Sequence, residues 1–140
     1  MKPPRERIVR SLVQQWIAKA DLDYRTAQSL LRDPEPIRES IAFHCPHAGE
    51  KYLKAFLVWK RIEFPKTHSI SQLLDLVSSV APELASSLES SQFLTPYGVE
   101  MRYPSDFPEM LPGQEETAFG LARNVREAIL AQLMPYVEEE

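Results

Sequence analysis

The reactive side chains of this chain gather in one stretch, residues 43–56, and in the short segment 65–68 that follows it. These two segments hold all three histidines, the only cysteine and three closely spaced charges: His44, His47, His68, Cys45, Glu50, Lys51 and Lys54. Such side chains can bind an anion, ligate a metal ion or transfer a proton. No other stretch is so rich in reactive groups, so it is the first place to look for a functional site.

Anion binding is the first chemistry that the spacing allows. If the stretch is helical, four polar side chains fall within about a quarter of a turn, beside an apolar face: His44, His47, Lys51 and Lys54. The lysines could act as point charges for a phosphate, and the imidazoles as hydrogen-bond donors or acid–base groups. The alternative is a polar helix edge, in which the lysines extend to solvent and the histidines cap a helix boundary. Both interpretations remain open.

Metal binding is the second possibility, because His44 and His47 are three residues apart and share a helical face. A zinc site normally takes three or four protein ligands, and no third or fourth ligand is evident from the sequence. Cys45 projects about 100° away from His44, onto the apolar face, where a single cysteine is usually a small hydrophobe. The sequence therefore predicts no metal, no cofactor and no Cys–His nucleophilic pair.

A further candidate lies in a proline-rich segment, residues 95–113, which we expect to be a long extended loop. It contains Arg102 and Tyr103, with Tyr97 upstream. A planar arginine flanked by tyrosines could clamp a phosphate or stack on a base. It could equally tie the loop to the rest of the protein through hydrogen bonds.

Helical spacing of apolar residues predicts the elements that carry these groups. A first helix of about 20 residues should begin near Ser11 and end before the Asp33-Pro34 pair. A second should run from Ile37 to roughly Ile62, although Pro46 predicts either a kink or a new start inside it. Its apolar residues cover most of its circumference, which predicts a central position.

Three shorter or later helices follow from local signals. Ser69 is a good N-cap, Pro82 suits a first helical turn, and Glu115 with Glu116 suits the start of a final helix. No strand-like alternation occurs. The predicted fold class is all-α, an antiparallel up-and-down bundle of four to five helices. We expect residues 1–10 to be a flexible N-terminus, 11–137 to form one domain, and 138–140 to be an acidic tail.

Composition limits the class of protein. The chain has 140 residues, 44% hydrophobic and 26% charged, with a net charge of -4, which is typical of one folded globular domain. The acidic balance argues against a surface that is basic throughout and binds nucleic acid by charge alone. A single cysteine, no signal-peptide pattern and no membrane-length apolar segment favour a cytoplasmic location.

With these residues described, the chain resembles the HEPN domain family, named for higher eukaryotes and prokaryotes nucleotide-binding. The resemblance runs from about Trp16 to about Val137. It is carried by Ala20-Asp21-Leu22-Asp23, Phe43-His44, Glu50-Lys51-Tyr52-Leu53-Lys54-Ala55, Pro65-x-Thr67-His68 with Leu73-Leu74, and Arg102-Tyr103-Pro104. The family resemblance implies a helical bundle, usually a homodimer, often encoded beside a small nucleotidyltransferase, in pairs that are commonly interpreted as toxin–antitoxin modules.

Two departures bear on activity. Cys45-Pro46-His47 stands where relatives commonly carry glutamines, so the local helix surface should differ. Ribonuclease members carry an arginine followed after four to six residues by a histidine near the last helix. Here Arg123-Asn124 begins such a pattern, but no histidine follows. Arg61 and His68 match the pattern by count, but they flank a proline turn in the wrong part of the chain.

The leading hypothesis is a partner-dependent HEPN protein, non-catalytic alone, that binds a nucleotide, RNA or a nucleotidyltransferase partner. The residues predicted to bind the ligand are His44, Lys51, Lys54, His68, Arg102 and Tyr103. One alternative is a metal-independent ribonuclease, in which an imidazole acts as general base and an arginine stabilises the phosphorane charge. The other is a purely structural dimerisation module, because a helix that is apolar nearly all round needs many partners.

Overall fold

The computed structural model describes residues 4–98 and 110–139, and within them the chain is all-helical. The elements are α1 (Pro4–Leu31), α2 (Arg38–Trp59), α3 (Ile70–Ser78), α4 (Pro82–Ser87), the 3-10 helix η1 (Glu89–Gly98) and α5 (Gln114–Val137). No strand occurs in these residues, so the all-α prediction is confirmed. None of these helices is both long and apolar enough to cross a membrane.

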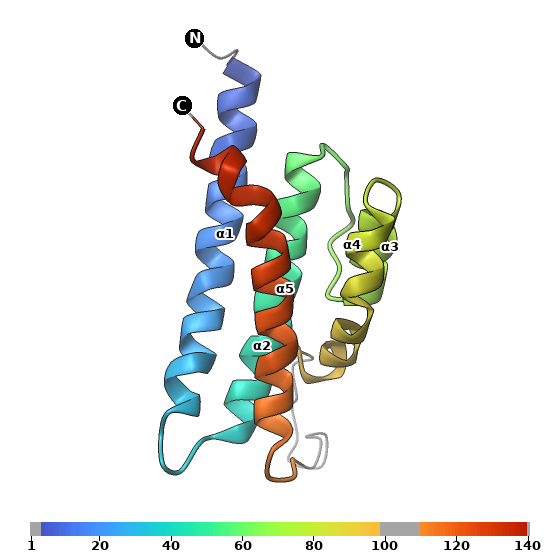
Figure 1. Ribbon diagram of the computed structural model, residues 1–140. Helices are drawn as coiled ribbons and strands as arrows, with labels where there is room; N and C mark the ends of the chain where they lie inside the picture. The colour runs from blue at the N-terminus through green and yellow to red at the C-terminus, as the bar shows by residue number, and fades with distance from the viewer. Residues whose placement is uncertain (1–3, 99–109, 140) are drawn as a thin grey trace.

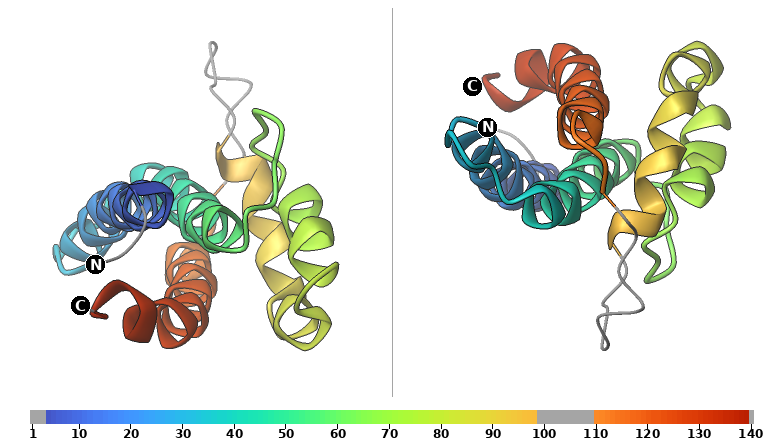
Figure 2. Two further views of the ribbon diagram at one scale, coloured as in Figure 1. Left: turned by 90° about the horizontal axis from the view of Figure 1, so that it is seen from above. Right: turned by 90° about the horizontal axis from the view of Figure 1, so that it is seen from below.

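Three long helices, α1, α2 and α5, stand side by side, and the shorter elements α3, α4 and η1 lie along one flank (Figure 1). If α4 and η1 are taken as one descending segment, α1, α2, this segment and α5 alternate in direction, with α3 additional (Figure 1). The predicted up-and-down order is therefore confirmed. Figure 2 shows α2 between the other long helices and the flank. It contacts α1, α5, α3 and η1.

The sequence of α2 explains its central position. Small residues on its buried side, such as Cys45, Ala48 and Ala55, allow close approach of neighbouring helices, and Tyr52 and Phe56 fill the space between them. Pro46 neither ends nor restarts the helix, which is continuous from Arg38 to Trp59. Its ring instead packs at the end of η1, since a Cβ added to Gly98 would lie 3.2 Å from the Pro46 Cγ. This contact brings the end of η1 beside His47.

Two expected boundaries are wrong. The first helix begins at Pro4 rather than near Ser11, and it has 28 residues rather than about 20. Proline is well tolerated in the first turn of a helix, where its missing N–H has no intrahelical partner in any case. Residues 95–98 of the expected loop belong to η1. This helix is held in place by the fully buried Leu94 and by Thr95, whose hydroxyl accepts a hydrogen bond from the Ile70 N–H at 3.2 Å.

The helix-start signals are confirmed. The Ser69 hydroxyl accepts a hydrogen bond from the Gln72 N–H at 3.2 Å, and Pro82 lies in the first turn of α4. Glu115 opens α5 and is buried, with its carboxylate 3.1 Å from the Arg38 Nε. Because α2 starts at Arg38, this ion pair fixes the starts of α2 and α5 side by side.

Candidate functional site

Two side chains of α2 converge on one carboxylate of α1. The Asp23 carboxylate lies 2.9 Å from His44 Nδ1 through one oxygen and 2.6 Å from Lys51 Nζ through the other. All three side chains are partly exposed. The helical spacing of His44 and Lys51 places both on the side of α2 that faces α1. Asp23 therefore neutralises Lys51 and orients the His44 ring.

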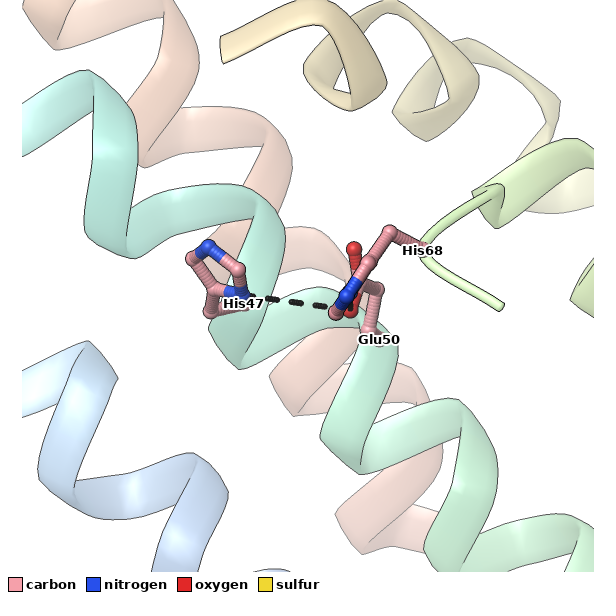
Figure 3. Close-up of side chains that lie close together, drawn as sticks. All are labelled: His47, Glu50 and His68. Atoms are coloured by element: carbon pink, nitrogen blue, oxygen red, sulfur yellow. Dashed lines mark hydrogen bonds and ion pairs between the residues drawn. The ribbon is translucent and has the colours of Figure 1, made fainter. Parts of the chain in front are cut away.

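A second carboxylate, that of Glu50, lies next to Lys51 in α2 and is 97% buried. Its Oε2 atom is 3.0 Å from His68 Nδ1 and 3.9 Å from His47 Nδ1. Figure 3 shows His47 and Glu50 on the ribbon of α2, with His68 reaching toward them from the loop before α3. The His47 and His68 rings meet edge to face, with centroids 5.7 Å apart. Two imidazoles from separate segments thus converge on one buried carboxylate.

Burial shifts the acid–base behaviour of this group. Desolvation raises the pKa of Glu50, although the hydrogen bond from His68 and the charges of His68, Lys54 and Lys51 oppose the shift. Desolvation also lowers the pKa of His47, which favours its neutral imidazole at neutral pH. The cluster therefore places a nitrogen lone pair of neutral His47 beside a carboxyl group whose ionisation is disfavoured by burial.

Lys54 lies on the same helix edge, but it is only 9% exposed and its ammonium contacts other parts of the protein. Its ammonium donates to the Thr67 carbonyl at 3.1 Å and lies 5.5 Å from the centre of the Trp16 ring. Its distance to the Phe64 ring centre is 5.9 Å. These contacts fasten the loop that carries His68 against α2. Lys54 thus positions His68 rather than presenting a free charge.

The structure divides the predicted binding residues into two neighbouring groups. His44 and Lys51 lie with Asp23, whereas His68 lies with Glu50 and His47, and Lys54 holds the loop between them. Arg102 and Tyr103 lie outside the residues that the structure describes. Cys45 is fully buried, and burial raises its pKa to about 12, as befits a small hydrophobe.

Sequence reasoning did not identify the two carboxylates that organise these groups. Asp23 lies in the run 20–23, which was noted only as part of the family resemblance, and Glu50 was noted as one of the clustered charges without a role of its own. The available signal was helical spacing, because Glu50 lies three residues after His47. The structure also separates His44 from His47 as possible metal ligands, since His44 turns to Asp23 and His47 to Glu50.

Arg61 and His68 do not form a site together. Arg61 follows the end of α2 with a left-handed backbone (φ 58°), in a groove that Trp59 and Tyr136 also line. His68 is bound to Glu50. Glu50 lies nine residues before Trp59 in α2, so the two positions are about 14 Å apart along the helix axis. The ribonuclease spacing of this pair is therefore a coincidence of sequence.

Phe43 adds an exposed aromatic ring to the same surface. Its side chain is 40% exposed, and its ring centroid lies 4.7 Å from that of His47 and 5.7 Å from that of His44. Three aromatic or imidazole rings of one helix therefore adjoin each other beside His68.

The HEPN domain model matches residues 13–133. The chain belongs to the HEPN domain family. Neither the search of curated proteins nor that of solved structures gave a match. The matched range of this HEPN domain includes Asp23, Phe43, Glu50 and His68, so both carboxylate groups lie inside the family domain rather than in an addition to it.

Proposed function

We propose that this HEPN protein binds a nucleotide or a short single-stranded RNA segment at the surface formed by Phe43, His44, Lys51 and His68. The observation that carries the proposal is the exposed Phe43 ring beside the imidazoles of His44 and His47, of which His44 shares Asp23 with Lys51. Aromatic side chains stack on unpaired bases, while cationic and N–H groups bind phosphates. Arg102 and Tyr103, predicted from the sequence to share this role, remain part of the proposal.

Charge determines what kind of ligand fits this surface. Asp23 neutralises Lys51, Glu50 lies under His68, and the whole chain carries a net charge of -4. Affinity that depends on phosphate neutralisation alone falls steeply with salt and needs many basic side chains. We therefore propose a ligand of one or a few nucleotides, bound by stacking and hydrogen bonds with weak salt dependence.

We propose that the chain does not cleave RNA by itself. In support, Arg123-Asn124 on α5 has no histidine after it in the sequence, and Arg61 and His68 lie in different regions. The competing function is a metal-independent ribonuclease. Cleavage of RNA by the purified protein, lost in His68→Ala or Arg61→Ala, would replace the binding proposal with that enzyme.

The binding proposal is tested by fluorescence anisotropy with a labelled single-stranded RNA oligonucleotide and with a labelled nucleotide. Phe43→Ala should weaken binding about tenfold or more, since stacking on one aromatic ring is worth about 1–3 kcal/mol per base. The matched control is Phe93→Ala, which removes a 68% exposed phenylalanine from η1. Equal affinities for the two variants, with both folded, would contradict the proposed surface.

Assembly and location are proposed on family membership. We propose a cytoplasmic homodimer that works with a nucleotidyltransferase-type partner within a toxin–antitoxin module. The apolar circumference of α2 no longer supports the dimer, because α1, α3, α5 and η1 cover it within one chain. Support comes instead from α1, whose Ile8, Leu12 and Leu22 side chains are exposed. A mass of two chains in solution is what the dimer requires.

A further inference from the structure

The two segments that meet at Glu50 bring together the donor atoms of a metal site. His47 and Glu50 lie one helical turn apart on α2, and His68 comes from the loop that precedes α3. One ligand atom from each of the three residues lies within 4.8 Å of the other two. Two imidazole nitrogens and one carboxylate oxygen are a donor set that zinc enzymes use, with a further position open to water or substrate.

The distances between these donors suit a shared ion. In a tetrahedral site with bonds of about 2.0–2.1 Å, neighbouring ligand atoms are separated by about 3.4 Å. The separations from Glu50 Oε2 are 3.0 Å to His68 Nδ1 and 3.9 Å to His47 Nδ1, on either side of that value. Small side-chain rotations are thus enough, and His68, which is 73% exposed, is free to make them.

The partners of the buried carboxylate all lie at one of its two oxygens, among the residues that the structure describes. Glu50 Oε1 is buried without a hydrogen-bond partner among the described residues, and the same holds for His47 Nε2. A buried polar atom without a partner is costly, so such an atom calls for a physical explanation. A cation bound by this carboxylate would offset the negative charge that burial removes from water.

We propose that His47, Glu50 and His68 (Figure 3) bind one divalent transition-metal ion of the zinc type, with the fourth coordination position on the side of the exposed His68. Two imidazoles select such an ion over Mg²⁺ or Ca²⁺, which prefer oxygen ligands. The metal proposal does not depend on the nucleotide or RNA proposal, because metal binding requires only these three side chains. His68 belongs to both proposed sites.

The neighbouring groups define the site further. Lys51 is neutralised by Asp23, and Lys54 directs its ammonium to the Thr67 carbonyl, so neither makes an ion pair with Glu50. His44 is held by Asp23 and does not join the three ligands. His44 is therefore a matched control: a histidine of the same helix, one turn away, outside the proposed coordination sphere.

The test uses tag-free full-length protein, stripped with a chelator and then titrated with Zn²⁺, with Co²⁺ as a spectroscopic probe and Mg²⁺ as the hard-ion comparison. We expect one equivalent of Zn²⁺ per chain, a higher melting temperature with Zn²⁺, visible Co²⁺ absorption bands, and no effect of Mg²⁺. Glu50→Gln and His68→Ala should lose stoichiometric binding, whereas His44→Ala should retain it.

Folding of the variants is checked on the metal-free proteins by circular dichroism and melting temperature. His68→Ala keeps the experiment decisive if Glu50→Gln folds poorly, because the His68 side chain is largely exposed. Absence of stoichiometric Zn²⁺ binding by the wild type would overturn the proposal. Unchanged binding by folded His68→Ala, or equal loss in His44→Ala, would overturn it as well.

Discussion

The carboxylates of Asp21 and Glu50 differ in the elements from which their partners come. Asp21 of α1 is bound by partners from α2 and α5, all within the three long helices. Glu50 of α2 is bound mainly by His68, which lies on a loop. The first group joins regular elements that pack together in any case, whereas the second joins a helix to a loop.

The Asp21 group joins side chains of all three long helices. The fully buried Tyr52 donates its hydroxyl hydrogen to Asp21, and Arg126 Nε lies 3.6 Å from the same carboxylate oxygen. The Arg126 guanidinium also lies 4.9 Å from the centre of the Tyr24 ring. Burial and the hydrogen bond to Asp21 raise the pKa of Tyr52, which keeps its hydroxyl a donor. We interpret this group as a structural tie between α1, α2 and α5.

The Glu50 group differs in the burial of its carboxylate and in the kind of atom that lacks a hydrogen bond. The Glu50 carboxylate is more deeply buried than that of Asp21, and one of its oxygens has no hydrogen-bond partner among the described residues. In the Asp21 group the buried atom without a hydrogen bond is Arg126 Nε, which lies 3.6 Å from the Asp21 carboxylate. A deeply buried carboxylate oxygen, rather than the number of charged residues, therefore separates the candidate binding group from the structural one.

The largest effect should come from breaking the structural tie. Asp21→Ala leaves the buried Tyr52 hydroxyl without its acceptor, and an unsatisfied buried group costs about 2 kcal/mol. For a domain of this size, such a loss lowers the melting temperature by roughly 6 °C. Chemical denaturation and thermal melting measure both quantities. Zinc binding at the Glu50 group should be unchanged in the folded variant.

Two comparisons make this prediction specific. Asp75→Ala removes an exposed aspartate from α3 and should change stability by less than about 0.5 kcal/mol. Asp21→Ala combined with Tyr52→Phe should recover part of the loss, because removing both partners leaves no unsatisfied hydroxyl. If the double variant lost as much as the sum of the single variants, the hydrogen bond would not be the source of the stability.

The rate at which a reagent labels the Cys45 thiol measures how much each group stabilises the helices against opening. This thiol is fully buried, with a pKa raised to about 12 by burial, so a thiol reagent at pH 8 should modify it only after the protein opens. Asp21→Ala should accelerate labelling about 30-fold, the factor equivalent to a loss of about 2 kcal/mol. His68→Ala should leave the rate nearly unchanged, and equal acceleration by both variants would contradict the distinction between the two groups.

Much of the fold could be predicted from sequence because its signals are local. Helical spacing, the Ser69 cap and the carboxylate at the start of α5 are read from neighbours within a few residues. The same spacing placed Cys45 on the buried face of α2. The start of α1 was misplaced because a proline pair was taken to oppose a helix, although proline fits a first turn.

The candidate site was harder to predict because its contacts are long-range. Asp23 meets Lys51 across 28 positions of the chain, and His68 meets Glu50 across 18. No periodicity indicates which helix edge faces which carboxylate, and a count of cationic residues does not reveal the acids that neutralise them. The sequence therefore indicated candidate residues but not their pairing.

The smallest expected effect concerns the sign of the Glu50 charge contribution. Burial raises the folded-state pKa of Glu50, so its contribution to stability is fully present below the ordinary value of 4.5 and is lost as the pH rises through the folded pKa. Glu50→Gln has no such dependence. In denaturation measured from pH 4 to pH 8 without metal, the variant should therefore gain stability relative to the wild type as the pH rises.

Glu63→Gln, at an exposed glutamate, is the control and should track the wild type more closely across this pH range. The opposite trend for Glu50→Gln would mean that the hydrogen bond from His68 and the nearby lysine charges outweigh desolvation. Glu50 would then have a structural role, as we interpret for Asp21. Zinc sharpens the distinction. Only the wild type should be stabilised when the ion is added, because binding to the folded state alone raises its stability. We therefore expect the difference in free energy of unfolding between wild type and Glu50→Gln to reverse sign when zinc is added. Such a reversal requires a carboxylate that destabilises the fold without a cation and stabilises it when it binds one.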